Sequence, residues 1–201
     1  MSLREQALEE IRSAISVGDL GEDRIFSAAG LAKTLGMSLS PVREAMMSLV
    51  AEGTVEAVPN RGYRLVPVAR ADLDEILRLR LILAEPAVQA LCASRDPATV
   101  ADLRTAADDA VTAAEAADRK GFFAADRRFH YLVLSRGLGG RAASIGLRLR
   151  DQSRVAHDEE KPQQADQESA VQLHRLIDLI AEGDAAGAVE LVDDNLRYFL
   201  K

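Results

Sequence analysis

The stretch MSLSPVREAMMSLVAEGTVEAVPNRGYRLVPV, residues 37–68, contains the signals that decide the fold of the N-terminal part of the chain. Ser40 predicts a helix N-cap, and Pro41 follows at the first helical position, where a missing N–H costs no hydrogen bond. Gly53 ends this helix, and the runs TVEAV and YRLVPV on either side of a PNRG turn predict a β-hairpin. The predicted inner face of the helix consists of Val42, Ala45, Met46 and Leu49.

Two further helices are predicted before this stretch. The apolar residues of the first recur at helical spacing: Leu8, Ile11 and Ile15. Gly18 ends that helix, Ser27 caps the second, and Gly36 closes it. Three helices followed by a hairpin form a winged helix-turn-helix, whose third helix enters the major groove of DNA.

The distribution of charge agrees with a DNA-binding N-terminal part, although the chain of 201 residues carries a net charge of −7. Residues 27–70 contain five basic and three acidic side chains, whereas residues 71–201 contain 17 basic and 23 acidic ones. The acidity therefore lies mainly in the second part, which suits a soluble body more than a nucleic-acid surface.

The second part is predicted to be all-helical, with a boundary at residues 67–72. Pro, Gly and polar residues separate predicted helices near 72–93, 97–118, 121–136, 140–156, 167–182 and 184–200. Pro86 should kink the first of these or restart it, and residues 158–168 read as a polar loop. The expected fold is mainly α: a winged helix-turn-helix over residues 1–68, then an all-α antiparallel bundle over residues 72–201.

Several classes of protein are disfavoured by the residues. The single cysteine, Cys92, cannot form an internal disulfide and suggests a reducing cytoplasm. No apolar run is long enough to span a bilayer, and no signal peptide is visible. No nucleophile pair, complete metal set or activated acid–base dyad is evident, so we expect no enzyme.

The helix-turn-helix pattern places polar side chains where DNA would lie. The hydroxyl groups of Ser38 and Ser40 can donate to phosphate, and Arg43 can reach a guanine edge with two hydrogen bonds. The wing would approach the backbone or the minor groove. The alternative from the residues alone is a solvated helix with ordinary arginines. The predicted DNA-binding residues are Ser38, Ser40, Arg43, Asn60, Arg61 and Gly62.

At this point the sequence resembles the GntR family of bacterial transcription regulators. The features that carry the resemblance are Pro41-Val42-Arg43-Glu44-Ala45, Leu49, Glu52-Gly53 and Asn60-Arg61-Gly62. The helical remainder resembles the FadR-type ligand-binding domain of that family, called FCD. The resemblance implies a homodimeric repressor that binds double-stranded operator DNA and responds to a small carboxylate effector. A dimer also follows from geometry, because one recognition helix reads too few bases.

The chain departs from the family at several DNA-facing positions. Ala29 and Leu39 stand where members usually carry arginine, and Met47 and Ser48 stand where basic residues are frequent. Arg43 is therefore the one main DNA-facing arginine retained. Fewer phosphate contacts predict weaker binding and a shallower salt dependence, while Leu39 and Met47 suit thymine methyl groups. We expect a different operator or a modest affinity.

Asp126 and His130 lie four residues apart, on one face of a predicted helix, and this face is mainly apolar because it also carries Phe122, Phe129 and Val133. This pair can coordinate a metal or a carboxylic ligand, and the simpler alternative is an ion pair within the helix. The resemblance implies a divalent metal held by such a pair and by one histidine from each of two later helices. Here Leu173 occupies the third ligand position, with His174 one residue away, and Asn195 occupies the fourth.

With two of four ligands replaced, we expect no tightly bound zinc, nickel or manganese. Asp126, His130 and Asn195 are instead predicted to line a polar pocket, with Arg80 supplying charge for a carboxylate; a surface role for Arg80 is equally compatible. Two other classes stay open: a metal-dependent enzyme built on the helical part, and a scaffold that has lost DNA specificity. Neither the effector, nor the operator, nor the direction of regulation follows from the sequence.

Overall fold

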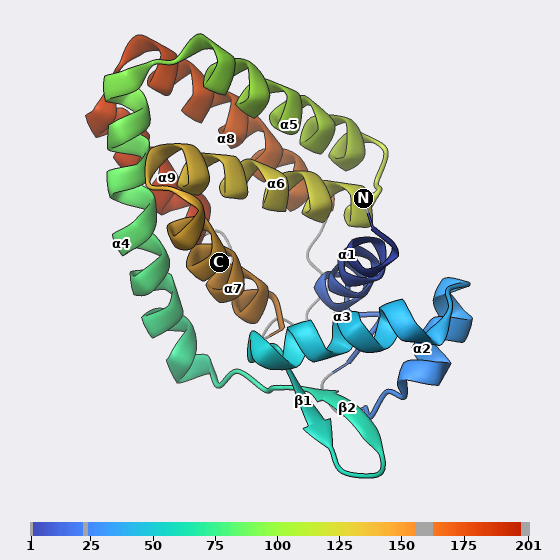
Figure 1. The fold of residues 1–201 in the computed structure, drawn as a ribbon. Coiled ribbons are helices and arrows are strands. Elements are labelled where there is room, and N and C mark those ends of the chain that lie inside the picture. Colours follow the sequence, from blue (N-terminus) through green and yellow to red (C-terminus); the bar gives the residue numbers. More distant parts are fainter. Residues whose placement is uncertain (1, 22–23, 156–162, 198–201) are drawn as a thin grey trace.

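The computed structural model describes residues 2–21, 24–155 and 163–197, and it divides into a small module and a helical bundle (Figure 1). The module contains α1 (Leu3–Ser16), α2 (Ala28–Leu35), α3 (Leu39–Ala51), β1 (Val55–Val58) and β2 (Gly62–Leu65). The bundle contains α4 (Arg70–Ser94), α5 (Pro97–Glu115), α6 (Arg119–Gly137), α7 (Gly140–Val155), α8 (Gln163–Glu182) and α9 (Ala185–Arg197). This order confirms the expected fold class.

The module is built by short local signals. Ser27 accepts a hydrogen bond from the backbone N–H of Gly30 and so caps α2, and Gly36 ends α2 in the left-handed conformation, both as predicted. β1 and β2 pair antiparallel, and Tyr63 exchanges two backbone hydrogen bonds with Phe26, of 2.7 and 2.9 Å. Gly62 has φ +132°, and a Cβ there would collide with the carbonyl oxygen of Phe26, so this wing position requires glycine.

The start of the recognition helix α3 differs from the prediction. The helix begins at Leu39 with Ser38 as its N-cap, not Ser40, and Pro41 is its third residue. Proline is tolerated there because the first four N–H groups of a helix have no partner within the helix. The hydroxyl of Ser40 instead donates to Glu44 Oε1 at 3.3 Å.

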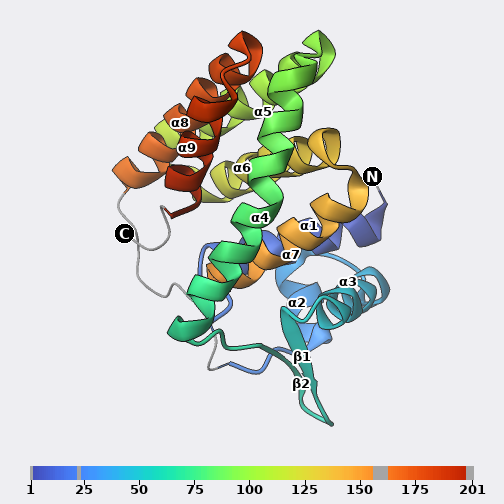
Figure 2. The ribbon, with the colours of Figure 1, turned by 90° about the vertical axis from the view of Figure 1, so that its left-hand side faces the viewer.

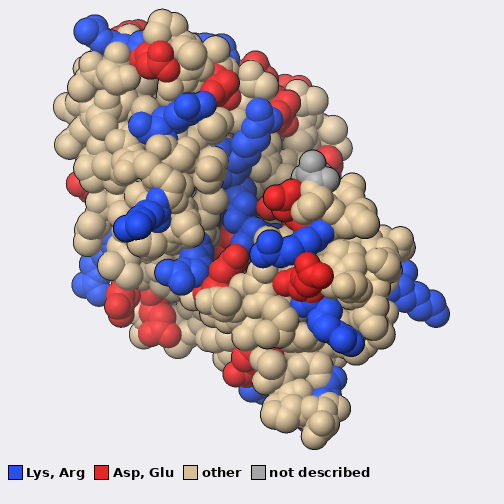
Figure 3. Space-filling view, in the orientation of Figure 1, with Lys and Arg blue, Asp and Glu red and all other residues tan. Residues whose placement is uncertain are grey.

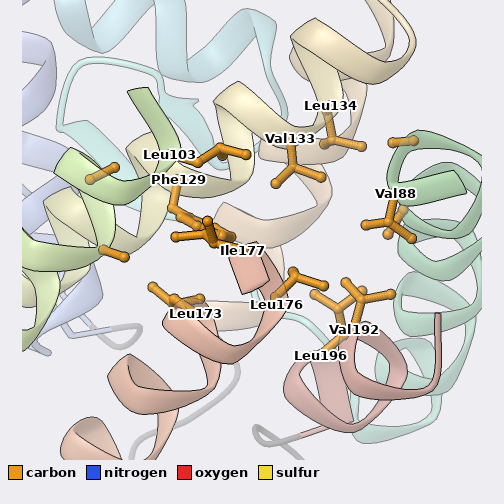
Figure 4. Packing of buried hydrophobic residues seen from close by; sticks show 14 of the residues in the cluster. Val88, Leu103, Phe129, Val133, Leu134, Leu173, Leu176, Ile177, Val192 and Leu196 are labelled. Carbon is orange, nitrogen blue, oxygen red and sulfur yellow. The ribbon is translucent and has the colours of Figure 1, made fainter. Parts of the chain in front are cut away.

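The bundle encloses one apolar cluster, part of which is drawn in Figure 4. α5 lies against α6 and α8, while α4 crosses them and contacts α9 and α7 (Figure 2). α4 continues through Pro86, so that residue does not end the helix. α8 begins at Gln163, which corrects the loop predicted over 158–168; residues 158–162 lie outside the described ranges. Residues 163–168, QQADQE, are mostly good helix formers, and Asp166 of this turn lies 3.4 Å from Arg119 Nε.

The module and the bundle meet mainly through α1, which packs against α6 and α7. β2 ends at Leu65 and α4 begins at Arg70, so a segment of four residues joins them. Their apolar clusters are separate, with Val17 the module residue that packs against the bundle's cluster. Within the described ranges, the helices are either too short or too polar to cross a membrane.

Candidate DNA-reading surface and effector site

The first two turns of α3 present side chains to solvent. Ser38, Ser40 and Arg43 are exposed, and the guanidinium of Arg43 makes no ion pair with the residues that the structure describes. The predicted inner face is buried: Val42, Ala45, Met46 and Leu49. Leu39 is 40% exposed and Met47 53% exposed, so the side chains that replace the family's usual basic residues lie on the same open side. This helix is therefore free to enter a groove in this arrangement.

The wing extends from the module at the lower end of Figure 1. Asn60 has φ +60°, a conformation that asparagine tolerates well, and both Asn60 and Arg61 are exposed at the turn. Arg64 pairs with Glu56 across the hairpin. Arg61, which pairs with no carboxylate in the described part of the chain, is thus the cation that the wing tip offers.

In the bundle, Arg80 from α4, His130 from α6 and Arg150 from α7 line a small cavity. Its remaining walls are small or apolar: Ala84, Val133, Leu134, Gly146, Val192 and Leu196. The volume is about 20 Å³, which is room for one water molecule. Asp126 lies next to it, with Oδ1 3.4 Å from His130 Nε2, so the predicted pair does meet at four-residue spacing.

Arg150 is the residue of this site that the sequence reading missed. It is 1% exposed, and its Nη2 and Nε donate to Asp126 Oδ2 at 2.5 and 3.1 Å. Nη2 also donates to the carbonyl of Phe123 at 3.2 Å. A signal for it was present, because Ala143, Gly146 and Leu147 form a buried stripe on α7 that Arg150 continues at helical spacing. An arginine on such a stripe is almost always paired with a carboxylate.

Two buried guanidinium groups face the cavity, with the carboxylates of Asp126 and Asp151 near them. Arg80 is buried and donates from Nη1 to Ser153 Oγ at 3.3 Å. Burial, together with the nearby charge of Arg150, lowers the pKa of Arg80 to about 10. The guanidinium of Arg80 therefore stays charged at neutral pH, although burial and Arg150 both disfavour its charge. Burial also lowers the pKa of His130 below its usual value, against the opposing effect of Asp126, and the imidazole is neutral at pH 7. A negative ligand would relieve the repulsion between the two guanidinium groups.

Asn195 is buried as predicted, but it faces α8 and not the cavity. Its Nδ2 donates to Gln172 Oε1 at 2.9 Å and lies 3.4 Å from Ser169 Oγ. From α9 the cavity is lined by Val192 and Leu196 instead. The predicted pocket of Asp126, His130 and Asn195 is thereby corrected, because the amide finds polar partners on the neighbouring helix.

The residues at the family's metal positions do not fit a divalent ion. Leu173 is buried in the apolar cluster, and His174 is turned to α5, where its Nε2 lies 3.2 Å from Asp108 Oδ1. This confirms the predicted rotation of one residue around α8. Asp126 is engaged by Arg150. Among the residues described, no three side chains of His, Cys, Asp or Glu gather as metal ligands do.

A winged helix-turn-helix with an open recognition helix, joined to an all-helical bundle, defines a class of DNA-binding transcription regulators. Residues 3–65 match the model of the bacterial regulatory proteins of the gntR family, and residues 75–198 match the FCD domain. The chain belongs to the GntR family and carries an FCD domain, as the sequence motifs indicated.

Individual relatives agree with this assignment. The chain is 35% identical over 132 residues to an uncharacterized HTH-type transcriptional regulator of Agrobacterium vitis, covering 64% of this chain and 77% of the relative. It is 29% identical over 136 residues to the HTH-type transcriptional regulator McbR of Escherichia coli, covering 68% and 62%. The solved structure of E. coli McbR/YncC superposes with a TM-score of 0.79 at 24% identity, over 98% of this chain and 94% of that one, which supports the fold.

Proposed function

We propose that this transcription regulator is a homodimeric, cytoplasmic repressor whose operator binding is modulated by a small organic carboxylate in the FCD domain. The observation that carries the effector part is the small cavity between two buried arginines and a neutral imidazole. The cavity holds about one water, so a carboxylate would have to move α4 and α7 apart. Such a movement is how occupancy would alter the arrangement of the DNA-binding modules.

For the DNA contacts, we propose that the first two turns of α3 read bases and that the wing contacts the backbone. The support is the exposure of Ser38, Ser40 and Arg43 on the helix and of Asn60 and Arg61 at the wing tip. Exposed Leu39 and Met47 favour contacts with thymine methyl groups over phosphate contacts. The operator should accordingly differ from the one that the more basic members of the family bind.

The dimer is proposed to form through α4 and α7, which pack side by side. The large apolar side chains exposed on these helices and on the turn before α7 are Leu79, Ile82, Leu138 and Ile145. Burial of these side chains against a second copy of the chain would favour a dimer. A two-fold dimer would also match a palindromic operator.

We propose further that the site works without a tightly bound metal and that the protein is not an enzyme. The guanidinium of Arg150 already occupies Asp126, and no converging donor set is found in the part of the chain that the structure describes. This disfavours the alternative of a metal-dependent enzyme built on the bundle. Metal analysis of the purified protein tests it: stoichiometric zinc, nickel or manganese would contradict the proposal.

The central experiment has two parts. Binding sequences are first selected from random duplex DNA with the full-length protein, and the dissociation constant of the selected site is measured by fluorescence anisotropy. A panel of mono-, di- and tricarboxylic acids is then screened for a rise in melting temperature, with Arg80→Met as the matched variant. If no sequence is selected, the proposal of sequence-specific DNA binding is refuted. If a carboxylic acid raises the melting temperatures of the wild type and of Arg80→Met equally, the proposed effector site is refuted.

A further inference from the structure

Two consecutive residues of α7 join the effector cavity to the DNA-binding module. Arg150 faces the cavity and Asp126, whereas Asp151 faces α1 and the module. Both side chains are buried, and Arg150 Nη1 lies 3.4 Å from Asp151 Oδ1. The guanidinium of Arg150 is therefore shared between two carboxylates, one on each side.

On the module side, Asp151 holds Arg12 of α1, whose Nε lies 3.3 Å from Asp151 Oδ2. Nη2 of the same arginine donates to Glu52 Oε2 at 2.5 Å, and Glu52 is the C-cap residue of the recognition helix α3. Burial acts to lower the pKa of Arg12, but Asp151 and Glu52 together raise it above the ordinary value. The side chain is 11% exposed, so these are partly buried ion pairs.

A second arginine secures α1 from the bundle side. In Arg127 of α6, Nε lies 3.2 Å from Asp151 Oδ1 and Nη1 lies 3.4 Å from Glu9 Oε1. Because the apolar clusters of module and bundle are separate, these charges carry much of the contact between the two parts. Figure 3 shows basic and acidic side chains alternating along this junction.

We propose that Arg150, Asp151, Arg12 and Glu52 form an ionic relay that reports the occupancy of the effector cavity to the recognition helix. The inference rests on the proposed function and names the means of regulation. An anion that pairs with Arg150 weakens its hold on Asp151. Asp151 is then available to Arg12, and the module is held more firmly against the bundle. The buried and partly buried ion pairs of this relay couple because water screens them less than it screens surface pairs.

A double-mutant cycle tests the relay without knowledge of the natural effector. Asp126→Asn removes one of the two carboxylates on Arg150, so Arg150 draws Asp151 away from Arg12. Arg12→Gln cuts the next link. Operator affinity is measured by anisotropy for the full-length wild type, both single variants and the double variant. A relay predicts that the two effects depart from simple multiplication by at least about three-fold, as contacting networks do.

The matched control combines Asp126→Asn with Arg104→Gln. Arg104 pairs with Asp178 at 3.1 Å on the surface between α5 and α8, away from the relay. The control effects should multiply to within two-fold. The proposal is overturned when the Arg12 cycle multiplies equally well. Should Asp126→Asn not fold, Arg150→Lys takes its place, since it keeps the charge but loses the forked contact.

A second measurement separates failure of the relay from failure of the proposed function. Hydrogen exchange of α1 is followed by mass spectrometry in the same proteins without DNA. Asp126→Asn should speed exchange of α1 by about three-fold or more in the wild-type background and leave it unchanged in the Arg12→Gln background. Equal acceleration in both backgrounds refutes the relay, even when no operator is found.

Discussion

Replacing Arg150 by Met should cost the protein about 3–5 kcal/mol of stability. Arg150 and Asp126 are both buried, and the substitution leaves the Asp126 carboxylate without its two hydrogen bonds from the guanidinium. Removal of one partner from a buried ion pair typically costs this amount, since the other charge stays uncompensated in a poorly solvated site. The carbonyl of Phe123 also loses its donor. For a chain of this size, each kcal/mol lowers the melting temperature by about 2–4 °C, so a fall of about 10 °C is expected.

Thermal and urea unfolding of the full-length protein, followed by circular dichroism at 222 nm, measures the effect. The double variant Arg150→Met with Asp126→Leu should recover most of the loss, because an apolar pair of similar volume replaces both charges. Arg104→Met, at the exposed pair with Asp178, is the control and should change stability by less than about 1 kcal/mol. A loss below 1 kcal/mol in Arg150→Met, or no recovery in the double variant, would refute the view that Asp126 depends on Arg150.

Three further outcomes follow from the structure. Gly62→Ala should destabilise the module by about 1–3 kcal/mol, because φ is +132° and the new Cβ meets the Phe26 carbonyl. Gly139→Ala is the control for backbone strain alone, since φ is +103° there and the space around it is open. Equal melting temperatures of the two variants would contradict a clash at Gly62. Arg43→Ala should weaken binding to the selected operator about 5- to 150-fold and binding to random DNA far less. The affinity of the wild type should depend only weakly on salt between about 50 and 200 mM. A steep salt slope in anisotropy titrations would argue against the proposal that Leu39 and Met47 replace phosphate contacts. The pKa of His130 in the folded protein lies below its unfolded value of 6.5, so the unfolded chain takes up a proton more readily. The stability contributed by neutral His130 is therefore fully present above pH 6.5 and is lost as the pH falls through the folded pKa. In chelator-treated protein, His130→Gln should flatten this fall in urea unfolding. An unchanged pH profile would show that Asp126 cancels the combined effect of burial and of the charges of Arg80 and Arg150 on the pKa of His130.

The DNA-binding module could be predicted closely because its signals are local. Ser27, Gly36, Gly53 and the PNRG turn act over three or four residues, and they give the same structure whatever packs around them. The start of α3 was wrong by two residues because Ser38 occupies the N-cap position without a side-chain cap hydrogen bond, and the third helical position tolerates proline as well as the first. The early start of α8 was missed because residues 163–168 are polar and good helix formers at once.

The candidate effector site was predicted less completely because its partners come from distant helices. Asp126 and His130 share one helix, so their proximity follows from spacing alone. The partner of Asp126, by contrast, is 24 residues away on α7, and Asn195 turns to Gln172 and Ser169 on α8. Periodicity places such residues on a buried face, but it does not say which buried neighbour each of them meets.

The burial of Asp126 connects the loss of the two imidazole positions with the presence of Arg150 at the candidate site. A carboxylate as buried as that of Asp126 needs a cation beside it. In the family pattern that the sequence resembles, a divalent metal fills this need, with imidazoles at the positions of Leu173 and Asn195. Here the guanidinium of Arg150 fills it, and both lost imidazole positions are satisfied in other ways, by apolar packing and by an amide network. A metal would therefore have to displace Arg150 from Asp126 and bring a second cation into a buried site where Arg150 keeps only Asp151 as a partner, and for this reason we propose an organic anion as the ligand.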